Sequence, residues 1–445
     1  MLVSLMRVIK VTGRIAPERI IIGGYVFYVI AGTLLLSMPF CRKLAEGPRL
    51  IDNLFIAVSA MSTTGLATVS VNSSYNFTGQ LVILALIQLG GLGYMTIGSF
   101  LSLAVSGKMS PFQTDISLKV LSMPENFKIG KFIKSIIVFT VLIELLGAIA
   151  LYPIFQSHGC QFPVWQAVFH SVSAFCTAGF SLIDTGFEGF RTDISLNIVI
   201  ITLSYLGAIG FIVLHDCWNC IIEKKRKITL TSKIIVWSTI WISIIGTILF
   251  AINEPLVSGK PVAERIISSW FQVMTASTTV GFNTIPIGSL SLSSVFLLTI
   301  VMIIGASPSG TGGGLKTTTF SALWAVMLSA VRHSENVTFA GKSIPFPRLK
   351  AAVAGLVFYL LALTCGIYAI SLVEQKNLTD LIFECASALG TVGLSRGITD
   401  SLSDIGKIII TVLMFIGRAG PVAIGMAIFV HKTKSSSFST EDIVV

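Results

Sequence analysis

The chain has 445 residues, of which 53% are hydrophobic and 12% charged, and its formal net charge is +10 at pH 7. So few charges could not cover the surface of a soluble fold of this length, so the composition excludes an ordinary soluble domain and indicates a polytopic protein in a lipid bilayer. The basic residues form no cluster with aromatic residues, so we expect no nucleic-acid partner.

Eight apolar stretches are long enough to cross a bilayer, which takes about 20 residues at the helical rise. They lie at about 20–40, 79–105, 132–153, 195–222, 234–252, 293–330, 350–373 and 405–430. They fall into pairs, and each pair brackets a shorter hydrophobic segment that ends in glycine. We therefore predict an all-α membrane protein of eight transmembrane helices and four re-entrant pore loops around one central pore. The predicted units are repeats at 15–105, 125–222, 230–330 and 345–432, and a short cytoplasmic tail at 433–445.

Basic residues are unevenly divided between the two sides of this arrangement. If the amino terminus is cytoplasmic, twenty of the 31 Lys and Arg residues fall on the inner side and nine on the outer side. The other two, Lys316 and Arg418, fall within apolar stretches. The positive-inside rule therefore predicts that both termini are cytoplasmic.

The segment between the two stretches of each pair has the same pattern in all four copies, about 100 residues apart. Each copy runs from a Phe through Ser or Thr, Ala and Thr to a Gly, and a large apolar residue follows. The copies are Phe55 to Gly65, Phe169 to Gly179, Phe271 to Gly281 and Phe383 to Gly393. One copy alone would indicate a glycine contact at a helix end. Four copies predict four like parts around a shared axis.

These segments have the chemistry of a cation pathway. A half-helix that ends within the bilayer directs its unpaired carbonyls and the negative end of its dipole inward, where they attract a cation. Glycine lets successive carbonyls point the same way, and a ring of carbonyls and threonine hydroxyls can replace the hydration shell of an alkali cation. No carboxylate lies in the ring, which disfavours a divalent cation. The predicted ion-binding residues are Thr63, Thr64, Gly65, Thr177, Ala178, Gly179, Thr279, Val280, Gly281, Thr391, Val392 and Gly393.

The sixth apolar stretch is too long for one span, and its middle carries five glycines, a proline and several hydroxyls, a composition that breaks a helix. It lies 24 residues after Gly281, so we expect it in the inner half of the pore, where it can block or clear the path. A phosphate-binding loop is disfavoured because Leu315 separates Gly314 from Lys316. The predicted gate residues are Gly305, Ser307, Ser309, Gly310, Thr311, Gly312, Gly313, Gly314, Lys316 and Arg418.

Polar side chains within apolar segments have either structural or functional roles. Arg418 lies 25 residues after Gly393, so we expect it below the ring, where it either holds the loop or pairs with a carboxylate or with helix carbonyls. Glu144 is expected to form a helix–helix hydrogen bond. The polar residues that follow the repeated Phe are expected to fix the half-helices, namely His170, Gln272 and Glu384.

The turns, the glycine-rich loop and the last apolar stretch together resemble the Trk/Ktr/HKT superfamily of cation transporters. The resembling segments are Ser62 to Leu66, Cys176 to Phe180, Thr278 to Phe282, Gly390 to Leu394, Gly305 to Thr319 and Phe415 to Pro421. The similarity covers about residues 15–430, and eight stretches without an additional amino-terminal pair resemble the KtrB branch. The resemblance implies a homodimer in a prokaryotic plasma membrane, with one K+ pore in each subunit. It also implies a cytoplasmic KtrA-like ring that binds ATP or ADP, whereas this chain binds no cofactor beyond K+, with Na+ as a candidate activator.

Other functions stay open at this point. Thr64 and Ala178 stand where the family more often has Val, so transport of Na+, or of monovalent cations with poor selectivity, is the alternative. HKT sodium transporters often carry Ser at the position of Gly65, so the four glycines favour K+. A membrane enzyme would need convergent ionisable groups, and an inverted-repeat transporter would need two halves of opposite topology; the sequence predicts neither.

Overall fold

The computed structural model describes residues 17–43, 47–93, 96–100, 103, 114, 129–222, 228–334, 336–339 and 341–420. Within these residues the regular structure is helical apart from one antiparallel hairpin, formed by β1 (Thr338–Phe339) and β2 (Lys342–Ser343). The amino-terminal segment, most of the connection at 104–128, and the segment from 421 through the predicted tail at 433–445 lie outside the described residues. The orientation of the two termini therefore stays a prediction.

The longer helices follow one another in four sets with a common order: a first helix, a shorter half-helix and a second helix. The sets are α2 (Pro17–Ser37), α3 (Leu50–Met61) and α5 (Phe77–Leu92); α8 (Ile129–Ser157), α9 (Pro163–Phe175) and α10 (Ile194–Ala208) with α11 (Phe211–Ile222); α12 (Leu230–Asn253), α14 (Val262–Thr278) and α15 (Leu292–Ile304) with α16 (Thr317–Val331); and α17 (Phe346–Ser371), α18 (Leu378–Gly390) and α19 (Asp404–Ala419). Short helices occupy the connections within the sets: η1 (Pro39–Cys41), α4 (Val71–Ser74), η2 (Glu188–Phe190), α13 (Pro255–Ser258) and η3 (Ile287–Ser289).

The second helix of each set begins in the same way. In all four, a polar side chain before the first turn accepts a hydrogen bond from the backbone N–H three residues later, which satisfies a donor that has no partner within the helix. The capping residues are Asn76, Asp193, Ser291 and Ser403. The return into the apolar layer after each glycine turn therefore starts at a position that local sequence defines.

The helix lengths support a helical membrane protein but do not confirm eight full spans. In the described part of the chain, α8, α12 and α17 are each long and apolar enough to cross a membrane, and the bent pair α10 and α11 makes a fourth if it counts as one span. The other apolar helices are shorter, among them those at Ile22–Ser37, Phe77–Leu92 and Leu292–Ile304.

Two of the predicted stretches are interrupted. The stretch predicted at 195–222 is not one helix, because α10 and α11 meet at an angle of 94° around Gly210, which has a φ of +92°. The stretch predicted to run to residue 105 contains α5, which ends at Leu92 before Gly93, with a φ of +77°. The predicted break in the sixth stretch is confirmed, since residues 305–316 separate α15 from α16.

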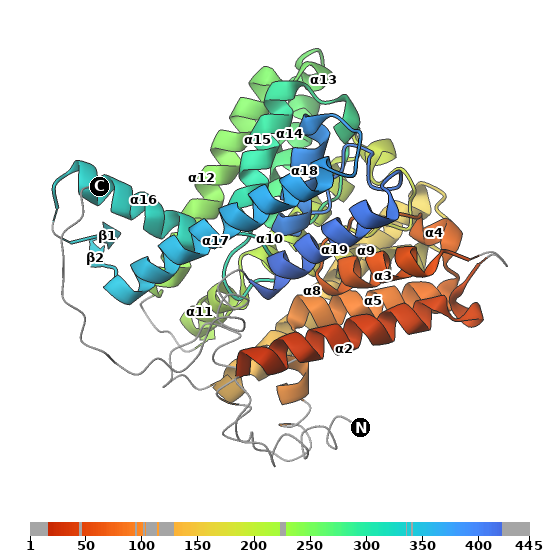
Figure 1. Cartoon of the computed structure of the whole chain (residues 1–445), viewed down its shortest axis with the longest axis horizontal. Helices are drawn as coiled ribbons and strands as arrows, with labels where there is room; N and C mark the ends of the chain where they lie inside the picture. The colour runs from red at the N-terminus through yellow and green to blue at the C-terminus, as the bar shows by residue number, and fades with distance from the viewer. Residues whose placement is uncertain are drawn as a thin grey trace.

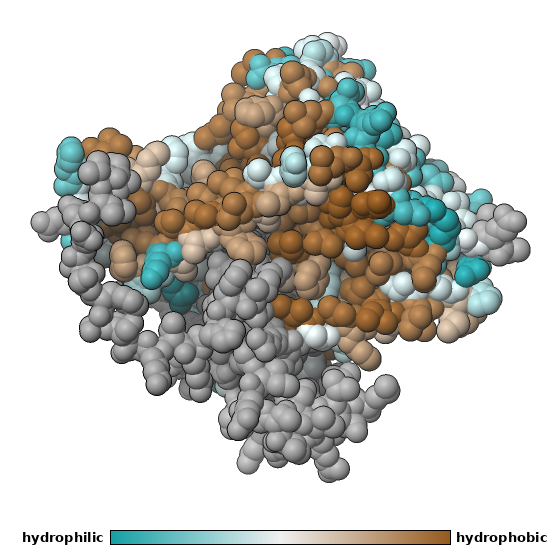
Figure 2. All heavy atoms as spheres, viewed as in Figure 1, coloured by the Kyte–Doolittle hydropathy of each residue, from teal (hydrophilic) through white to brown (hydrophobic). Residues whose placement is uncertain are grey.

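The four sets pack as a closed ring. The second helix of each set contacts the half-helix of the next: α5 contacts α9, α10 contacts α14, α15 contacts α18, and α19 returns to α3. Figure 1 shows this closure, with α19 lying beside α3 although they come from opposite ends of the chain. Figure 2 shows a broad apolar surface over these helices, and hydrophilic residues gather at the edge where the loops lie.

A buried ion pair joins the last set to the first. Lys407 Nζ in α19 lies 2.6 Å from Asp52 Oδ1 in α3, and these side chains are only 5% and 7% exposed. Arg49 extends the network, since it lies 3.3 Å from Asp52 and 2.9 Å from Asp404. Removing one partner of such a pair would leave an uncompensated buried charge, so the pair fixes how the ring closes.

Candidate cation-binding site

Each half-helix ends in the same unusual turn. The repeated threonine has a left-handed backbone, which costs a side-chain-bearing residue about 1–2 kcal/mol, and the repeated glycine also has positive φ. The φ values are +52° at Thr63, +50° at Thr177, +59° at Thr279 and +51° at Thr391, and +95° at Gly65, +65° at Gly179, +84° at Gly281 and +92° at Gly393. The same unfavourable conformation at four equivalent positions is a signal of function.

The four glycines form a closed circle of contacts. A Cβ atom on Gly65 would meet the carbonyl oxygen of Ala178, and one on Gly179 would meet that of Val280. In the same way Gly281 faces the carbonyl of Val392, and Gly393 returns to the carbonyl of Thr64. At every junction the Cα atom of the next glycine lies within 3.2 Å of the added Cβ. Only glycine fits at these four positions.

Hydrogen bonds from the half-helix hold each turn in place. In all four copies the residue before the glycine donates its N–H to the carbonyl of the repeated Ser or Thr; these bonds run from Thr64 to Ser59, Ala178 to Ser173, Val280 to Thr275 and Val392 to Ser387, at 2.8 to 3.1 Å. In two copies the hydroxyl of that Ser also accepts from the glycine N–H, from Gly65 and from Gly393, at 3.1 Å. The repeated Ser or Thr is therefore explained as the support of the turn.

The polar residues after the repeated Phe tie the half-helices to the segments beyond the glycines, as predicted. The His170 ring lies 3.0 Å from Ser181 Oγ, and the Gln272 amide lies 3.1 Å from Thr284 Oγ1. The Glu384 carboxylate accepts hydrogen bonds from Ser395, at 2.8 Å, and from Thr399. All three are buried, so these contacts fix the far side of the turns.

The loop at 305–316 lies directly against the four threonines. The two ends of the loop meet, because Ala306 N–H donates to Gly313 O at 3.2 Å. Thr311 lies near its tip: its carbonyl accepts from Thr63 Oγ1 at 3.1 Å, and its hydroxyl lies 3.0 Å from Thr177 Oγ1. Cβ atoms added to Gly312 and Gly313 would meet the hydroxyls of Thr279 and Thr391, respectively. The loop therefore covers one face of the ring.

The bend between α10 and α11 accommodates this loop. Three backbone hydrogen bonds of 3.2 Å join them: Ser307 N–H to Ala208 O, Thr311 N–H to Gly207 O, and Phe211 N–H to Ser309 O. The carbonyls and the amide at the break thus find partners in the loop and not within a helix. This is the physical reason why the stretch at 195–222 is not continuous.

Two partly buried basic side chains hold the loop through carbonyl groups. Lys316 Nζ donates to Gly312 O at 2.7 Å. Arg418 donates to Thr311 O, to Thr63 Oγ1 at 3.1 Å, and to Gly90 O at the end of α5. Within the described residues no carboxylate pairs with either cation. In the described part of the chain, Arg418 thus contacts a helix carbonyl, Gly90 O, and a loop carbonyl, Thr311 O.

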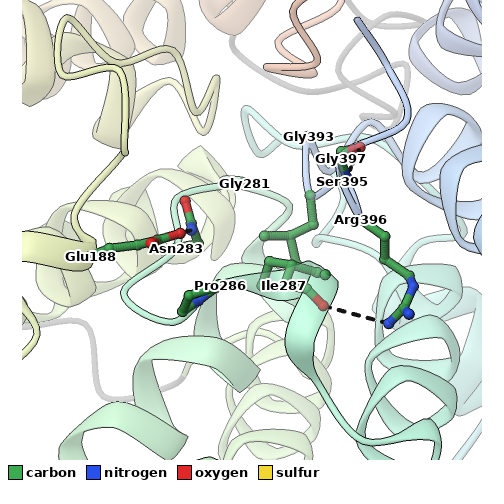
Figure 3. A pocket seen from close by; sticks show the side chains of 11 residues that line it. Glu188, Gly281, Asn283, Pro286, Ile287, Gly393, Ser395, Arg396 and Gly397 are labelled. Atoms are coloured by element: carbon green, nitrogen blue, oxygen red, sulfur yellow. Dashed lines mark hydrogen bonds between the residues drawn. The ribbon is translucent and has the colours of Figure 1, made fainter. Parts of the chain in front are cut away.

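A cavity of about 390 Å³ lies at the third and fourth turns, and no residue of the loop lines it. Gly281 and Gly393 line it, with Glu188 and Asn283 on one side and Arg396 on the other (Figure 3). The Glu188 carboxylate accepts from Asn283 Nδ2 at 2.8 Å, and Arg396 forms an ion pair with Asp380 at 2.5 Å. The predicted site residues did not include Glu188.

Glu144 has the predicted structural role. Its Oε2 accepts from Gln88 Nε2 at 3.1 Å, which joins α8 to α5.

Within the part of the chain that the structure describes, no group of three or more His, Cys, Asp or Glu side chains is placed to hold a metal ion.

Comparisons with known proteins place the chain among cation transporters. The family model of TrkH, described as a cation transport protein, matches residues 29–439. The Potassium/sodium uptake protein NtpJ of Enterococcus hirae is 33% identical over 96% of both chains, and the Ktr system potassium uptake protein B of Bacillus subtilis is 31% identical over 92% of both. The Ktr system potassium uptake protein B of Vibrio alginolyticus is 28% identical over 91% of this chain and 90% of that protein.

A solved structure agrees with this result at the level of the fold. The potassium transporter TrkH of Vibrio parahaemolyticus superposes with a TM-score of 0.74 and 19% identity, over 94% of this chain and 86% of that chain. The two Ktr system potassium uptake proteins B confirm the resemblance to KtrB-type transporters. The chain belongs to the TrkH family of cation transport proteins and is a membrane transporter, not an enzyme.

Proposed function

We propose that this chain is the membrane-embedded, channel-like subunit of a potassium uptake system and that the four glycine turns select K+. The observation that carries the proposal is the closed circle of contacts among Gly65, Gly179, Gly281 and Gly393. A bare alkali cation needs a cage of oxygen atoms, and four turns with equivalent backbones supply carbonyls from every side. The potassium uptake proteins among the relatives support K+ as the ion.

Transport of Na+, or of monovalent cations without strong selectivity, is the second candidate. One relative is named a potassium/sodium uptake protein, and Thr64 and Ala178 make the first two turns differ from the last two.

The surrounding machinery follows from the same proposal. The loop at 305–316 is the gate, held closed by Arg418, and the cavity lined by Glu188 is the outer mouth. The units are four repeats of helix, re-entrant half-helix and helix, with both termini in the cytoplasm of a prokaryotic cell. Two copies form a dimer on a cytoplasmic ring of KtrA-like subunits that bind ATP or ADP, and Na+ is a candidate activator.

Uptake into proteoliposomes that contain only this chain tests the proposal. With equal concentrations of K+, Rb+ and Na+ offered separately, we expect K+ and Rb+ to enter and Na+ to enter at least about tenfold more slowly, as a carbonyl cage predicts. Equal entry of Na+ would favour the second candidate. Failure of all three ions to enter liposomes, with protein shown to be folded by size-exclusion chromatography, would contradict the proposal.

A shortened loop should conduct faster. Deleting residues 308–311 removes Thr311 and its contacts with Thr63 and Arg418, and the remaining ends already meet at the bond between Ala306 and Gly313. Hydrogen bonds to charged groups contribute about 1.5–3 kcal/mol, so we expect Rb+ uptake without a partner to rise about tenfold. Uptake into proteoliposomes, normalised to reconstituted protein, measures the effect.

A single substitution in the loop should have a smaller effect than this deletion. Thr311→Val removes only the hydroxyl that bonds to Thr177 and to Phe175 O, so a rise of about threefold is expected for the loss of neutral hydrogen bonds. Thr202→Val is the matched control, because among the described residues the exposed Thr202 hydroxyl bonds only to Ile198 O in its own helix. A folded deletion variant with unchanged or lower uptake would make the loop a structural connection and not a gate.

A further inference from the structure

We propose that the Glu188 carboxylate is a capture site for the incoming monovalent cation, at the mouth of the ring opposite the loop. This inference rests on the proposed potassium pathway and assigns its first binding step to one residue. The cavity that Glu188 lines also exposes Gly281 and Gly393, so a cation held there is already at the turns (Figure 3).

The charges around the cavity leave Glu188 uncompensated. The guanidinium of Arg396 is neutralised by Asp380 at 2.5 Å, and the buried Glu384 lies behind Ser395 and accepts its hydroxyl hydrogen bond. The Glu188 carboxylate has only the neutral amide of Asn283 as a partner, through Oε1. Among the described residues no Lys, Arg or His pairs with Glu188, and its Oε2 atom has no hydrogen-bond partner.

Asn283 fixes this carboxylate close to the ring. It comes two residues after Gly281, and its side-chain Nδ2 donates to Glu188 Oε1 and to Ile285 O, at 2.8 and 3.2 Å. Its backbone carbonyl accepts from Phe187 N–H at 3.0 Å. Asn283, which belongs to the third set of helices, therefore holds Glu188 and its neighbour Phe187 of the second set at the junction between the two sets. Its half-buried side chain is held in place while Oε2 is free to meet a cation.

A fixed carboxylate in a concave mouth has two effects on a cation. It concentrates cations from solution, and its oxygen can replace one water of hydration before the ion reaches the carbonyls. Both effects lower the KM of uptake and leave the maximal rate, which the ring and the loop set, nearly unchanged. The first effect weakens with ionic strength, because added salt screens the charge.

The competing interpretation is that Glu188 is only a hydrogen-bond acceptor for Asn283 at a junction between helix sets. Glu188→Gln separates the two roles, because the glutamine carbonyl still accepts from Asn283 but carries no charge. Asp184→Asn is the matched control. Asp184 is four residues earlier and exposed, accepts from Ser70 and does not line the cavity.

The test is the KM for Rb+ uptake into proteoliposomes at two ionic strengths. When choline chloride rises from about 10 to about 150 mM, the screening length falls from about 30 to about 8 Å, and the KM of the unaltered chain should rise about threefold. Glu188→Gln should show the higher KM already at low salt, with little further dependence on salt. Glu188→Asp should keep the salt dependence, and Asp184→Asn should behave as the unaltered chain.

Different failures point to different conclusions. If the unaltered chain transports Rb+ with a KM that does not depend on choline chloride, the capture site is wrong whether or not any variant folds. If Glu188→Gln transports with the KM and salt dependence of the unaltered chain, the capture site is again wrong and the potassium pathway stands. If the unaltered chain takes up no Rb+ at all, both proposals are wrong.

Discussion

Replacing Gly281 by alanine should abolish discrimination between K+ and Na+ in a chain that still folds. At a φ of +84°, the added Cβ would meet the carbonyl oxygen of Val392 and lie 3.0 Å from the Cα atom of Gly393. The fourth turn must then move outward, which opens the oxygen cage on one side. A shift that costs about 1.4 kcal/mol in binding weakens K+ affinity about tenfold. The wider cage also fits the bare K+ ion less closely, so it no longer favours K+ over Na+.

Gly159→Ala is the control for backbone strain. Gly159 also has positive φ, +67°, but a Cβ there would have no atom within 4 Å. Both substitutions cost stability, about 1 kcal/mol for a left-handed alanine, and only Gly281→Ala intrudes on a neighbouring turn. Uptake of K+ and Na+ by both variants, with melting temperatures in detergent, separates the effects. Wild-type K+ affinity and selectivity in a folded Gly281→Ala protein would contradict the role of the ring.

The four turns could be predicted from sequence because each is built from local contacts that recur. The N–H of the residue before each glycine reaches back to the carbonyl of the repeated Ser or Thr, a few residues away in the same half-helix. These local contacts recur in all four half-helices, so the same pattern of Phe, Ser or Thr, Ala, Thr and Gly recurs in the sequence. The break at 305–316 was predictable for the same kind of reason, since glycine and proline act on their own segment.

The contacts that assemble the ring could not be predicted in this way. Lys407 and Asp52 are 355 residues apart, and nothing in either segment indicates that they meet. The bend at Gly210 was missed because residues 195–222 are apolar enough overall to predict one span, in which Gly207 and Gly210 are weak signals. The bend depends on hydrogen bonds to Ser307, Ser309 and Thr311 in another set of helices, so tertiary contacts override local preference there.

Glu188 was missed for a third reason. The repeated pattern ends at the glycine, and Glu188 lies nine residues after Gly179, in a segment that the four copies do not share. A search for acidic residues soon after each glycine would have found it, together with Asp184 and Asp400, without distinguishing the one that lines the cavity. The residues that line the cavity thus come from segments that differ between the repeats, and their common pattern does not predict them.

Arg418→Gln should raise uptake by the chain alone and reduce the extra activation that a nucleotide-binding partner supplies. The guanidinium joins three elements: the loop through Thr311 O, the first turn through Thr63 Oγ1, and the end of α5 through Gly90 O. In a low-dielectric site each such bond contributes about 1.5–3 kcal/mol, so losing the bond to the loop should increase basal uptake about tenfold. A partner that opens the loop then increases uptake by a smaller factor, because the open state is already more populated without it.

Arg418→Lys separates charge from geometry. A lysine keeps the positive charge that repels cations from a closed pore, but its single ammonium cannot reach Thr311 O and Gly90 O in the planar arrangement of a guanidinium. If the bridge matters, Arg418→Lys should be nearly as active without the partner as Arg418→Gln; if repulsion matters, it should stay as inactive as the unaltered chain. Rb+ uptake with and without the co-expressed partner decides between them. If both variants keep a low basal rate and the full activation ratio, Arg418 only supports the end of α5, and the force that closes the loop comes from Lys316 and the backbone contacts at 207–211.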